Sequence, residues 1–315
     1  MKSVHQKPEM HPRNPHNNGY DFVALAKIHA PLSGFLAKNP YGKLTIDFAQ
    51  PSAVKALNAA LLNYYYQVQV WDIPDGYLCP AVPGRADYVH YIADLLTSTA
   101  QAQTTQAQNQ PIKGLDIGTG ANLIYPIVAS QSYQWQMLGS DIQKQSLASA
   151  QRIIDANPNL QSRVAVRLQT NPNTHFAGII KPGEYYEFSM CNPPFHISAQ
   201  AAASGSRKKN RNLARHQHKR RSKDSVAHTA NQSKLNFGGQ HNELWCSGGE
   251  LQFVSNMMKE SVQFKQQVGW FTSLLSKKEH IATLSALANS LGAVQCKSIN
   301  MAQGAKASRF IAWRF

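Results

Sequence analysis

From residue 113 to the end, the chain alternates short apolar segments with amphipathic ones, and this alternation restricts the fold more than any other feature. Strands that alternate with helices form a mostly parallel sheet with helices on both faces, so we expect an α/β fold. The expected strands are 113–117, 135–142, 163–170, 185–191, 268–275, 293–301 and 309–315. The expected helices are 122–131, 144–156, 246–264 and 278–291. Only residues 302–308 separate the last two strands, so we expect these strands to be antiparallel neighbours at the end of the sheet.

The N-terminal third lacks this alternation. Residues 1–20 are rich in His, Pro and Asn and are basic in balance, which predicts a mobile arm with solvent-exposed or RNA-facing histidines, His11 and His16 among them. Residues 21–100 are expected to be mainly helical, with one helix starting at Pro51 and another over 86–96. Residues 98–110 are polar and of low complexity. We therefore predict an N-terminal extension, 1–110, and a second domain, 111–315.

The charge of the chain favours a polyanionic partner. Lys and Arg number 32 against 17 Asp and Glu, a formal net charge of +15. Within a predicted insert at about 199–240, residues 206–223 hold nine Lys and Arg and no acidic residue. Phosphate contacts explain this run better than a solubilising tail does. The residues expected to make these contacts are Arg207, Lys208, Lys209, Arg211, Lys219, Arg220 and Arg221.

Targeting and cysteine patterns narrow the class further. The sequence shows no apolar run long enough for a transmembrane helix and no apolar signal segment near residue 1, so we expect a cytoplasmic protein and no membrane partner. The four cysteines are widely spaced and none has zinc-ligand spacing. We therefore expect free thiols and no metal.

The first motif is LDIGTGAN, residues 115–122, where the first expected strand turns into a helix. Gly118 and Gly120 permit a tight turn and close approach of a ligand, and Asp116 ends the strand. The third glycine of a dinucleotide fingerprint is absent, which weakens a phosphate-binding interpretation and leaves a plain turn open. Asp141 follows Gly120 by 21 residues, the spacing of a carboxylate that binds ribose hydroxyls.

The second motif is CNPPF, residues 191–195, at the end of the fourth expected strand. An exocyclic amine such as adenine N6 is a poor nucleophile, because its lone pair is delocalised into the ring. The side-chain oxygen of Asn192 and the carbonyl of Pro193 can accept its two N–H groups, while Pro194 stiffens the turn. Phe195 offers a face on which an extruded base can stack. Catalysis would then depend on orientation and electrostatics.

Together these motifs resemble amino-group methyltransferases that carry an Asn-Pro-Pro-aromatic turn. Several segments narrow the resemblance to the bacterial 23S ribosomal RNA adenine-1618 N6-methyltransferase family: DFAQPSAVKALNAALL, WDIPDGYLCPAVPGRADYVHYIADLL, CNPPFHIS, LNFGGQHNELWCSGGE and MAQGAKASRFIAW. The resemblance covers nearly the whole chain, except parts of 98–112 and 206–232. It implies a Rossmann-like class I methyltransferase sheet with an N-terminal RNA-binding extension.

The resemblance also implies roles for single residues and partners. S-adenosyl-L-methionine is the implied cofactor, with Arg85 at its carboxylate end, Gly118 at the methionine turn, Asp141 at the ribose and Asn192 at the target amine. The implied substrate is 23S ribosomal RNA or a large-subunit assembly intermediate. The oligomeric state is not predicted, although a monomer is favoured.

Two other functions stay open. The same turn would serve N5-methylation of a protein glutamine side chain, although that class favours Tyr in place of Phe195 and lacks a basic insert. A catalytically inactive RNA-binding protein is the other alternative, and the intact motifs argue against it. Trp71, Tyr77 and Trp245 are candidates for base stacking, although core packing is the simpler interpretation.

Overall fold

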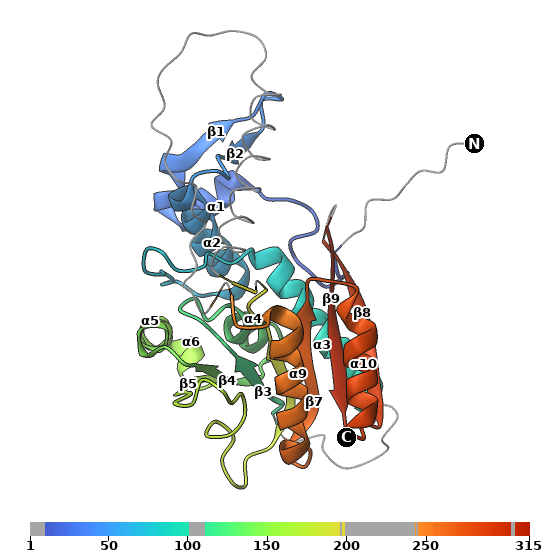
Figure 1. Ribbon diagram of the computed structural model, residues 1–315. Coiled ribbons are helices and arrows are strands. Elements are labelled where there is room, and N and C mark those ends of the chain that lie inside the picture. The colour runs from blue at the N-terminus through green and yellow to red at the C-terminus, as the bar shows by residue number, and fades with distance from the viewer. Residues whose placement is uncertain (1–9, 101–110, 196, 199–242, 244, 304–305) are drawn as a thin grey trace, which may run out of the picture.

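The structure is a computed structural model of the 315-residue chain, and it describes residues 10–100, 111–195, 197–198, 243, 245–303 and 306–315. A seven-stranded sheet lies at its centre (Figure 1), with strand order β5-β4-β3-β6-β7-β9-β8. The strands are β3 (Lys113–Ile117), β4 (Gln136–Asp141), β5 (Val164–Leu168), β6 (Tyr186–Cys191), β7 (Val268–Leu275), β8 (Gln295–Gln303) and β9 (Lys306–Arg314). The α/β fold predicted from the alternation is confirmed.

Strand direction also follows the sequence pattern. Strands β5, β4, β3, β6 and β7 pair in parallel, as expected for strands joined through helices. Strands β8 and β9 form the expected antiparallel pair at the end of the sheet, with Gln295 opposite Arg314. Strand β9 lies between β7 and β8, so the last strand of the chain is an interior strand.

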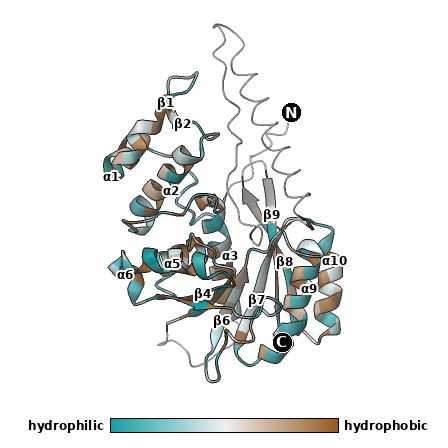
Figure 2. Cartoon of the chain, turned by 60° about the vertical axis from the view of Figure 1, so that its left-hand side comes forward, coloured by the Kyte–Doolittle hydropathy of each residue, from teal (hydrophilic) through white to brown (hydrophobic). Residues whose placement is uncertain are grey.

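Two layers of helices bury the two faces of the sheet. The helices against one face are α3 (Val82–Ala100), α4 (Ile124–Tyr133) and α5 (Lys144–Asp155), and those against the other are α9 (Gly249–Ser261) and α10 (His280–Ser290). Strand β9 shows why both layers form: Phe310 and Ala312 join the first core, and Ile311 and Trp313 join the second. Helices α9 and α10 carry both hydrophilic and hydrophobic residues (Figure 2), as helices with one buried face do. The short elements α6 (Pro158–Gln161) and η2 (Val262–Phe264) complete this part of the fold.

The N-terminal region is mainly helical, as predicted, but it also contains a small hairpin. Its elements are α1 (Phe22–Ile28), η1 (Ala30–Phe35), β1 (Leu36–Lys38), β2 (Leu44–Ile46) and α2 (Pro51–Tyr66). Strands β1 and β2 pair antiparallel, and the side chain of Asn39 accepts hydrogen bonds from the backbone N–H groups of Tyr41 (2.9 Å) and Lys43 (3.0 Å). Three-residue strands are too short to show an alternating pattern, which explains why this hairpin was not expected.

The N-terminal region packs directly on the sheet domain. Helix α3 is longer than expected, because it includes Pro83, Gly84 and Arg85 at its start and residues 97–100 at its end. Leu61 and Leu62 of α2 lie in the same hydrophobic core as Ile127 and Val128 of α4. The proposed boundary near residue 110 thus separates two parts of the chain that share one core.

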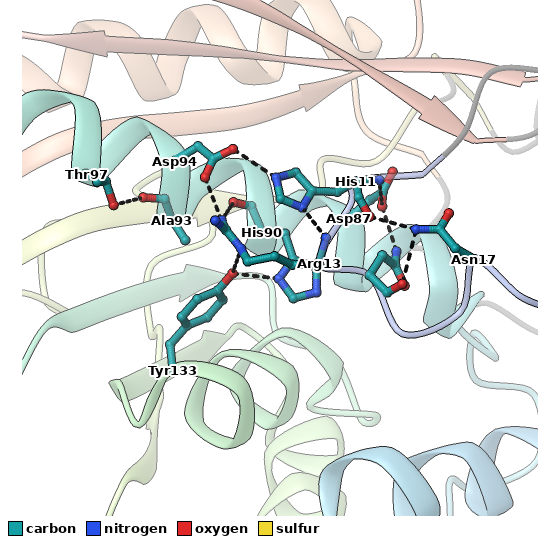
Figure 3. Close-up of polar contacts among 10 residues, drawn as sticks. His11, Arg13, Asn17, Asp87, His90, Ala93, Asp94, Thr97 and Tyr133 are labelled. Atoms are coloured by element: carbon teal, nitrogen blue, oxygen red, sulfur yellow. Dashed lines mark hydrogen bonds and ion pairs between the residues drawn. The ribbon is translucent and has the colours of Figure 1, made fainter.

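The prediction of a mobile N-terminal arm is wrong for residues 10–20. The side chains of His11 and His16 are 5% and 3% exposed, so these histidines are not solvent-facing. The Nε2 atom of His11 lies 2.9 Å from a carboxylate oxygen of Asp94, and Arg13 donates to the other oxygen at 2.6 Å (Figure 3). The His11 backbone N–H also donates to Asp87 at 2.9 Å. Acidic side chains on α3 are the polar partners that allow this basic segment to be buried.

Three expectations concern what the chain lacks. No helix among the described residues is long and apolar enough to cross a membrane. The same residues contain no group of His, Cys, Asp and Glu side chains that could hold a metal ion. All four cysteines are free thiols, as the sequence predicted.

Candidate active site

A pocket lies at the carboxyl ends of the parallel strands, where the strand order reverses around β3. Strand β3 is followed in the chain by β4 on one side, while β6 pairs with its other side. Such reversal points are the usual ligand sites of open α/β sheets. The pocket contains about 960 Å³ of space, part of which is open solvent.

The glycine turn after β3 forms the floor of this pocket. Gly118 (φ +75°) and Gly120 (φ +66°) both lie in the left-handed region that favours glycine, as the motif predicted. The N–H groups of Gly118 and Thr119 donate to the carbonyl of Ser140, each at 2.9 Å. A Cβ atom on Gly118 would meet no atom within 4 Å, so backbone conformation rather than crowding requires glycine there.

Asp141 lies at the end of β4, in the wall of the pocket, and is 6% exposed. One carboxylate oxygen accepts the N–H of Gly120 at 3.0 Å, and the other accepts the N–H of Gln143 at 2.8 Å. Burial raises the pKa of Asp141, while these backbone N–H groups lower it. Each carboxylate oxygen has a further lone pair, so the side chain can also accept hydrogen bonds from two ligand hydroxyl groups.

Asp116 is placed differently from the other predicted cofactor residues. It is fully buried on β3 and is not among the pocket-lining residues. Neither of its carboxylate oxygens has a hydrogen-bond partner among the described residues. Burial raises the pKa of Asp116 to about 7; the neighbouring Thr119 hydroxyl and Arg85 lower it, and Asp141 raises it. A role for Asp116 in cofactor binding stays a prediction.

Arg85 reaches the pocket from the first turns of α3. Its guanidinium group donates to the hydroxyl of Tyr125 at 2.8 Å and lies 5.6 Å from the centre of that ring. Burial raises the pKa of Tyr125 to about 12, although Arg85 lowers it, so the phenol stays neutral. Arg85 is therefore a fixed positive charge at one end of the pocket, suited to a ligand carboxylate.

The CNPPF segment follows β6 at the side of the pocket opposite Asp141. Asn192 and Pro194 line the pocket, whereas Pro193 is buried and Phe195 half-buried outside the lining. The side-chain oxygen Oδ1 of Asn192 is buried and has no hydrogen-bond partner among the described residues. Leaving such an acceptor unpaired costs about 1–3 kcal/mol, so this oxygen is suited to a donor on a bound molecule.

The predicted phosphate contacts cannot be placed. Arg207, Lys208, Lys209, Arg211, Lys219, Arg220 and Arg221 all lie outside the residues that the structure describes. Of the candidate base-stacking residues, Trp71 is 5% exposed and donates its indole N–H to the carbonyl of Asn122 at 2.9 Å. Tyr77 is 9% exposed, and Trp245 is half-buried. Core packing thus accounts for Trp71.

Several pocket residues were given no role from the sequence, among them Asn122, the last residue of the LDIGTGAN motif. Asn122 contacts Leu78, whose carbonyl lies 3.4 Å from the Asn122 amide, and the backbone N–H of Leu78 donates to Glu243 at 3.2 Å. These bonds fasten the loop before α3 against the glycine turn. His175 also lines the pocket. Only the position of Asn122, two residues beyond Gly120, could have drawn attention to it.

Comparison with known proteins agrees with this arrangement. A family model described as RNA methyltransferase matches residues 4–315. Ribosomal RNA large subunit methyltransferase F of Saccharophagus degradans is 49% identical over 322 residues, which cover 100% of this chain and 97% of that protein. The protein of the same name from Klebsiella pneumoniae is 48% identical over 310 residues, covering 98% of this chain and 96% of that one.

Solved structures of a human methyltransferase share the fold. The human METTL16 catalytic domain in complex with the MAT2A 3'UTR hairpin 6 is 28% identical, with a TM-score of 0.76 over 98% of this chain and 97% of that one. The N-terminal domain of human METTL16 in complex with SAH is 25% identical, with a TM-score of 0.73 over 98% of this chain and 99% of that one. The chain therefore belongs to the RNA methyltransferase family and is an S-adenosylmethionine-dependent methyltransferase.

Proposed function

We propose that this methyltransferase transfers a methyl group from S-adenosylmethionine to the N6 amine of an unpaired adenine in 23S ribosomal RNA. One observation carries the proposal: Asn192 lines the pocket, and its buried Oδ1 atom has no hydrogen-bond partner among the described residues. An acceptor in that state suits an N–H donor, and an exocyclic amine is such a donor. Bound S-adenosylmethionine supplies a methyl group on positively charged sulfur.

The residues around Asn192 support methyl transfer to a planar nitrogen. Accepting one N–H at Asn192 Oδ1 and the other at the Pro193 carbonyl would draw the amine toward a tetrahedral geometry and free its lone pair. Neither Pro193 nor Pro194 has a backbone N–H that could compete for these acceptors. The half-buried ring of Phe195 would stack on the base. No side chain has to remove a proton first, because the proton becomes acidic only after transfer.

The pocket also fits the cofactor by charge. Arg85 would bind the carboxylate of the methionine portion, and Asp141 would accept the two ribose hydroxyls. Gly118 and Gly120 would bring the backbone of the turn against the methionine portion, with Asp116 beneath it. Asp141 would act as a carboxylate, the form that its backbone N–H partners favour although burial raises its pKa; burial also raises the pKa of Asp116, to about 7.

The nature of the RNA follows from the relatives and from charge. Relatives that match this chain over nearly its full length are named as large-subunit ribosomal RNA methyltransferases. The net charge of +15 favours a polyanion, and the cations within residues 207–221 would add phosphate contacts. We propose that residues 1–110 recognise RNA, and that the substrate is 23S ribosomal RNA or a large-subunit assembly intermediate. Because extrusion costs least for an unpaired base, the target adenine would lie in a loop or junction.

The catalytic assignment is tested with Asn192→Ala. Methyl transfer should fall at least about 100-fold, because one hydrogen bond to a transition state contributes about 2.7–4 kcal/mol. Calorimetry should show almost unchanged affinity for S-adenosylmethionine, since the proposed cofactor contacts lie elsewhere. Asn289→Ala, at an exposed position on α10, is the matched control and should leave both quantities unchanged. Retention of more than about a tenth of the wild-type rate would remove Asn192 from the mechanism.

The substrate is tested by offering both nucleic acid and protein. Purified enzyme and labelled cofactor are incubated with ribosomal RNA from a strain that lacks the gene, and separately with ribosomal proteins and release factors. Label recovered as N6-methyladenosine after nuclease digestion supports the proposal. Label found only in protein, stable to nuclease and lost on protease treatment, would replace it with glutamine methylation.

A further inference from the structure

A buried His–Glu pair borders the pocket, and none of the roles above uses it. His175 follows β5 in the chain, lines the pocket and is 8% exposed. Its ring atom Nδ1 lies 3.0 Å from a carboxylate oxygen of Glu260, which comes from α9 on one face of the sheet. The pair joins the segment after β5 to a helix more than 80 residues later in the chain.

The surroundings of Glu260 fix the state of this pair. Its carboxylate accepts three backbone N–H groups, those of His175 (2.7 Å), Phe176 (3.0 Å) and Ala177 (2.8 Å). Burial raises the pKa of Glu260, but the hydrogen bonds from His175 and from the backbone outweigh it, so that pKa lies below its usual range. The carboxylate is thus ionised, and Nδ1 of His175 carries the proton that it donates.

The other ring nitrogen of His175 is left for a ligand. Within the described part of the chain, Nε2 makes no hydrogen bond, and it is not among the enclosed polar atoms without a partner. The edge of the ring meets Phe253, with centroids 4.6 Å apart and planes at 85°. In the neutral imidazole with its proton on Nδ1, Nε2 is an acceptor, and it belongs to a residue that lines the pocket.

The strand order identifies the end of the pocket at which His175 lies. Arg85, at the proposed carboxylate end, comes from α3, and the ribose carboxylate Asp141 ends β4. Strand β5 is the next strand beyond β4, at the edge of the sheet. A cofactor laid from Arg85 past Asp141 would therefore reach the segment after β5 with its adenine ring.

The other polar side chains of that segment are already engaged. Gln169 donates to the carbonyl of Ala177 at 2.9 Å and accepts the N–H of Asn171 at 2.9 Å. The Thr174 hydroxyl donates to the Asn171 carbonyl at 3.2 Å. Among these three pocket side chains, His175 is the one with a ring nitrogen, Nε2, that makes no hydrogen bond to the described residues.

We propose that Nε2 of His175 accepts a hydrogen bond from the 6-amino group of the cofactor's adenine, and that Glu260 is the positioning residue that holds the imidazole in the required tautomer. His175 thereby determines specificity for adenine over a 6-oxo purine. A 6-oxo group would place its oxygen, a hydrogen-bond acceptor, against Nε2 of His175, which is also an acceptor. This proposal concerns binding of the cofactor alone. Its test does not depend on which nitrogen receives the methyl group.

The test is binding selectivity, measured by calorimetry without turnover. The two ligands are S-adenosylhomocysteine and S-inosylhomocysteine, in which an oxo group replaces the 6-amino group. Wild-type protein should bind the adenosine compound at least about tenfold more tightly, because the site would lose one hydrogen bond and leave a polar group unpaired. Equal affinity for the two ligands in the wild-type protein would overturn the proposal without any variant.

Variants assign the selectivity to His175. His175→Leu should bring the ratio of the two dissociation constants to within about threefold of unity. The control is His280→Leu, which removes a half-buried histidine that is likewise paired with a glutamate, Glu250 at 2.7 Å, and is not among the pocket-lining residues; the ratio should stay at its wild-type value. Selectivity that survives in His175→Leu, with circular dichroism matching the wild type, would refute the role.

The positioning role of Glu260 can be tested separately by NMR. Nitrogen-15 spectra of labelled histidine should show His175 protonated at Nδ1 in the wild type, with the Nε2 resonance moving when S-adenosylhomocysteine is added. Glu260→Gln should change this tautomer and lower the selectivity ratio. A Glu260→Gln protein that keeps both the tautomer and the ratio would show that the carboxylate only fastens the loop.

Discussion

The buried carboxylate of Asp116 should make the unfolding free energy depend on pH, and the size of this effect follows from the structure. It lies on β3, fully enclosed, with no hydrogen-bond partner for either oxygen among the described residues. Chiefly because of burial, its pKa is raised to about 7 from an ordinary value of 3.8. Asp116→Asn replaces this group with a neutral one of nearly the same shape.

The sign of the effect follows from proton linkage. Between pH 3.8 and 7, the folded protein holds a proton on Asp116 that the unfolded chain has lost, so stability falls as pH rises through this range. Above pH 7 both states are ionised, and the penalty is constant. At about 1.4 kcal/mol per pKa unit, the full penalty is about 4 kcal/mol. About half of it, roughly 2 kcal/mol, should develop between pH 5.5 and 8.

The assay is urea unfolding of the protein without added cofactor, at several pH values from 5.5 to 8. The difference in unfolding free energy between Asp116→Asn and wild type should grow by roughly 2 kcal/mol in favour of the variant over that range. Titrating groups that do not interact with Asp116 affect both proteins equally and cancel in the difference. Asp75→Asn, at an exposed loop position, is the control for removing a carboxylate that is not buried. A constant difference for Asp116→Asn would refute the account of its ionisation.

Three further outcomes are expected. Burial lowers the pKa of His16 to about 4, and the neighbouring His90 contributes to this shift. Burial also lowers the pKa of His90 to about 4, and His11 adds to this effect. The stability that the two neutral histidines contribute above pH 6.5 should therefore be lost progressively as the pH falls towards 4. Hydrogen exchange of residues 10–20, corrected for the intrinsic pH dependence of amide exchange, should accordingly show less protection at pH 5 than at pH 7, and unchanged protection would count against it. Arg85→Gln should weaken S-adenosylmethionine binding about 10- to 100-fold by calorimetry, because a charge-assisted bond of about 1.5–3 kcal/mol is lost. Neutralising the cations within residues 207–221 should flatten the log–log salt dependence of RNA binding by about 3, if roughly four of them meet phosphates; an unchanged slope would contradict phosphate contact.

The strands of the sheet could be predicted closely because a buried strand is a short apolar segment that can be recognised in the sequence. Strands covered on both faces are continuous apolar runs, and β3 and β7 have the bounds that their runs predicted. The site residues found in advance belong to contiguous motifs: the glycine turn, Asp141 at a fixed spacing beyond it, and Asn192 at a strand end. Each of these positions is set by backbone geometry within a few residues.

What was missed depends on contacts between distant parts of the chain. Nothing near His175 signals that Glu260 will lie beside its ring, because 85 residues separate them. The segment holding His11 and Arg13 has the composition of a flexible tail, and its acidic partners, Asp87 and Asp94, lie 76 and 83 residues beyond His11. Composition predicts whether a segment can form a core on its own. These segments are instead buried against acidic side chains from distant parts of the chain, which their own composition cannot reveal.

The docked N-terminal segment also bears on the pocket, because both use helix α3. The Asn14 amide donates to the carbonyl of Pro83 at 2.9 Å and to the carboxylate of Asp87 at 2.6 Å, on either side of Arg85 in the chain. Backbone carbonyls of a first helical turn normally bond within the helix, so a side chain fastened there restrains that turn. Residues far ahead of the motifs in the sequence thus help to hold the guanidinium group of Arg85 where it lines the pocket.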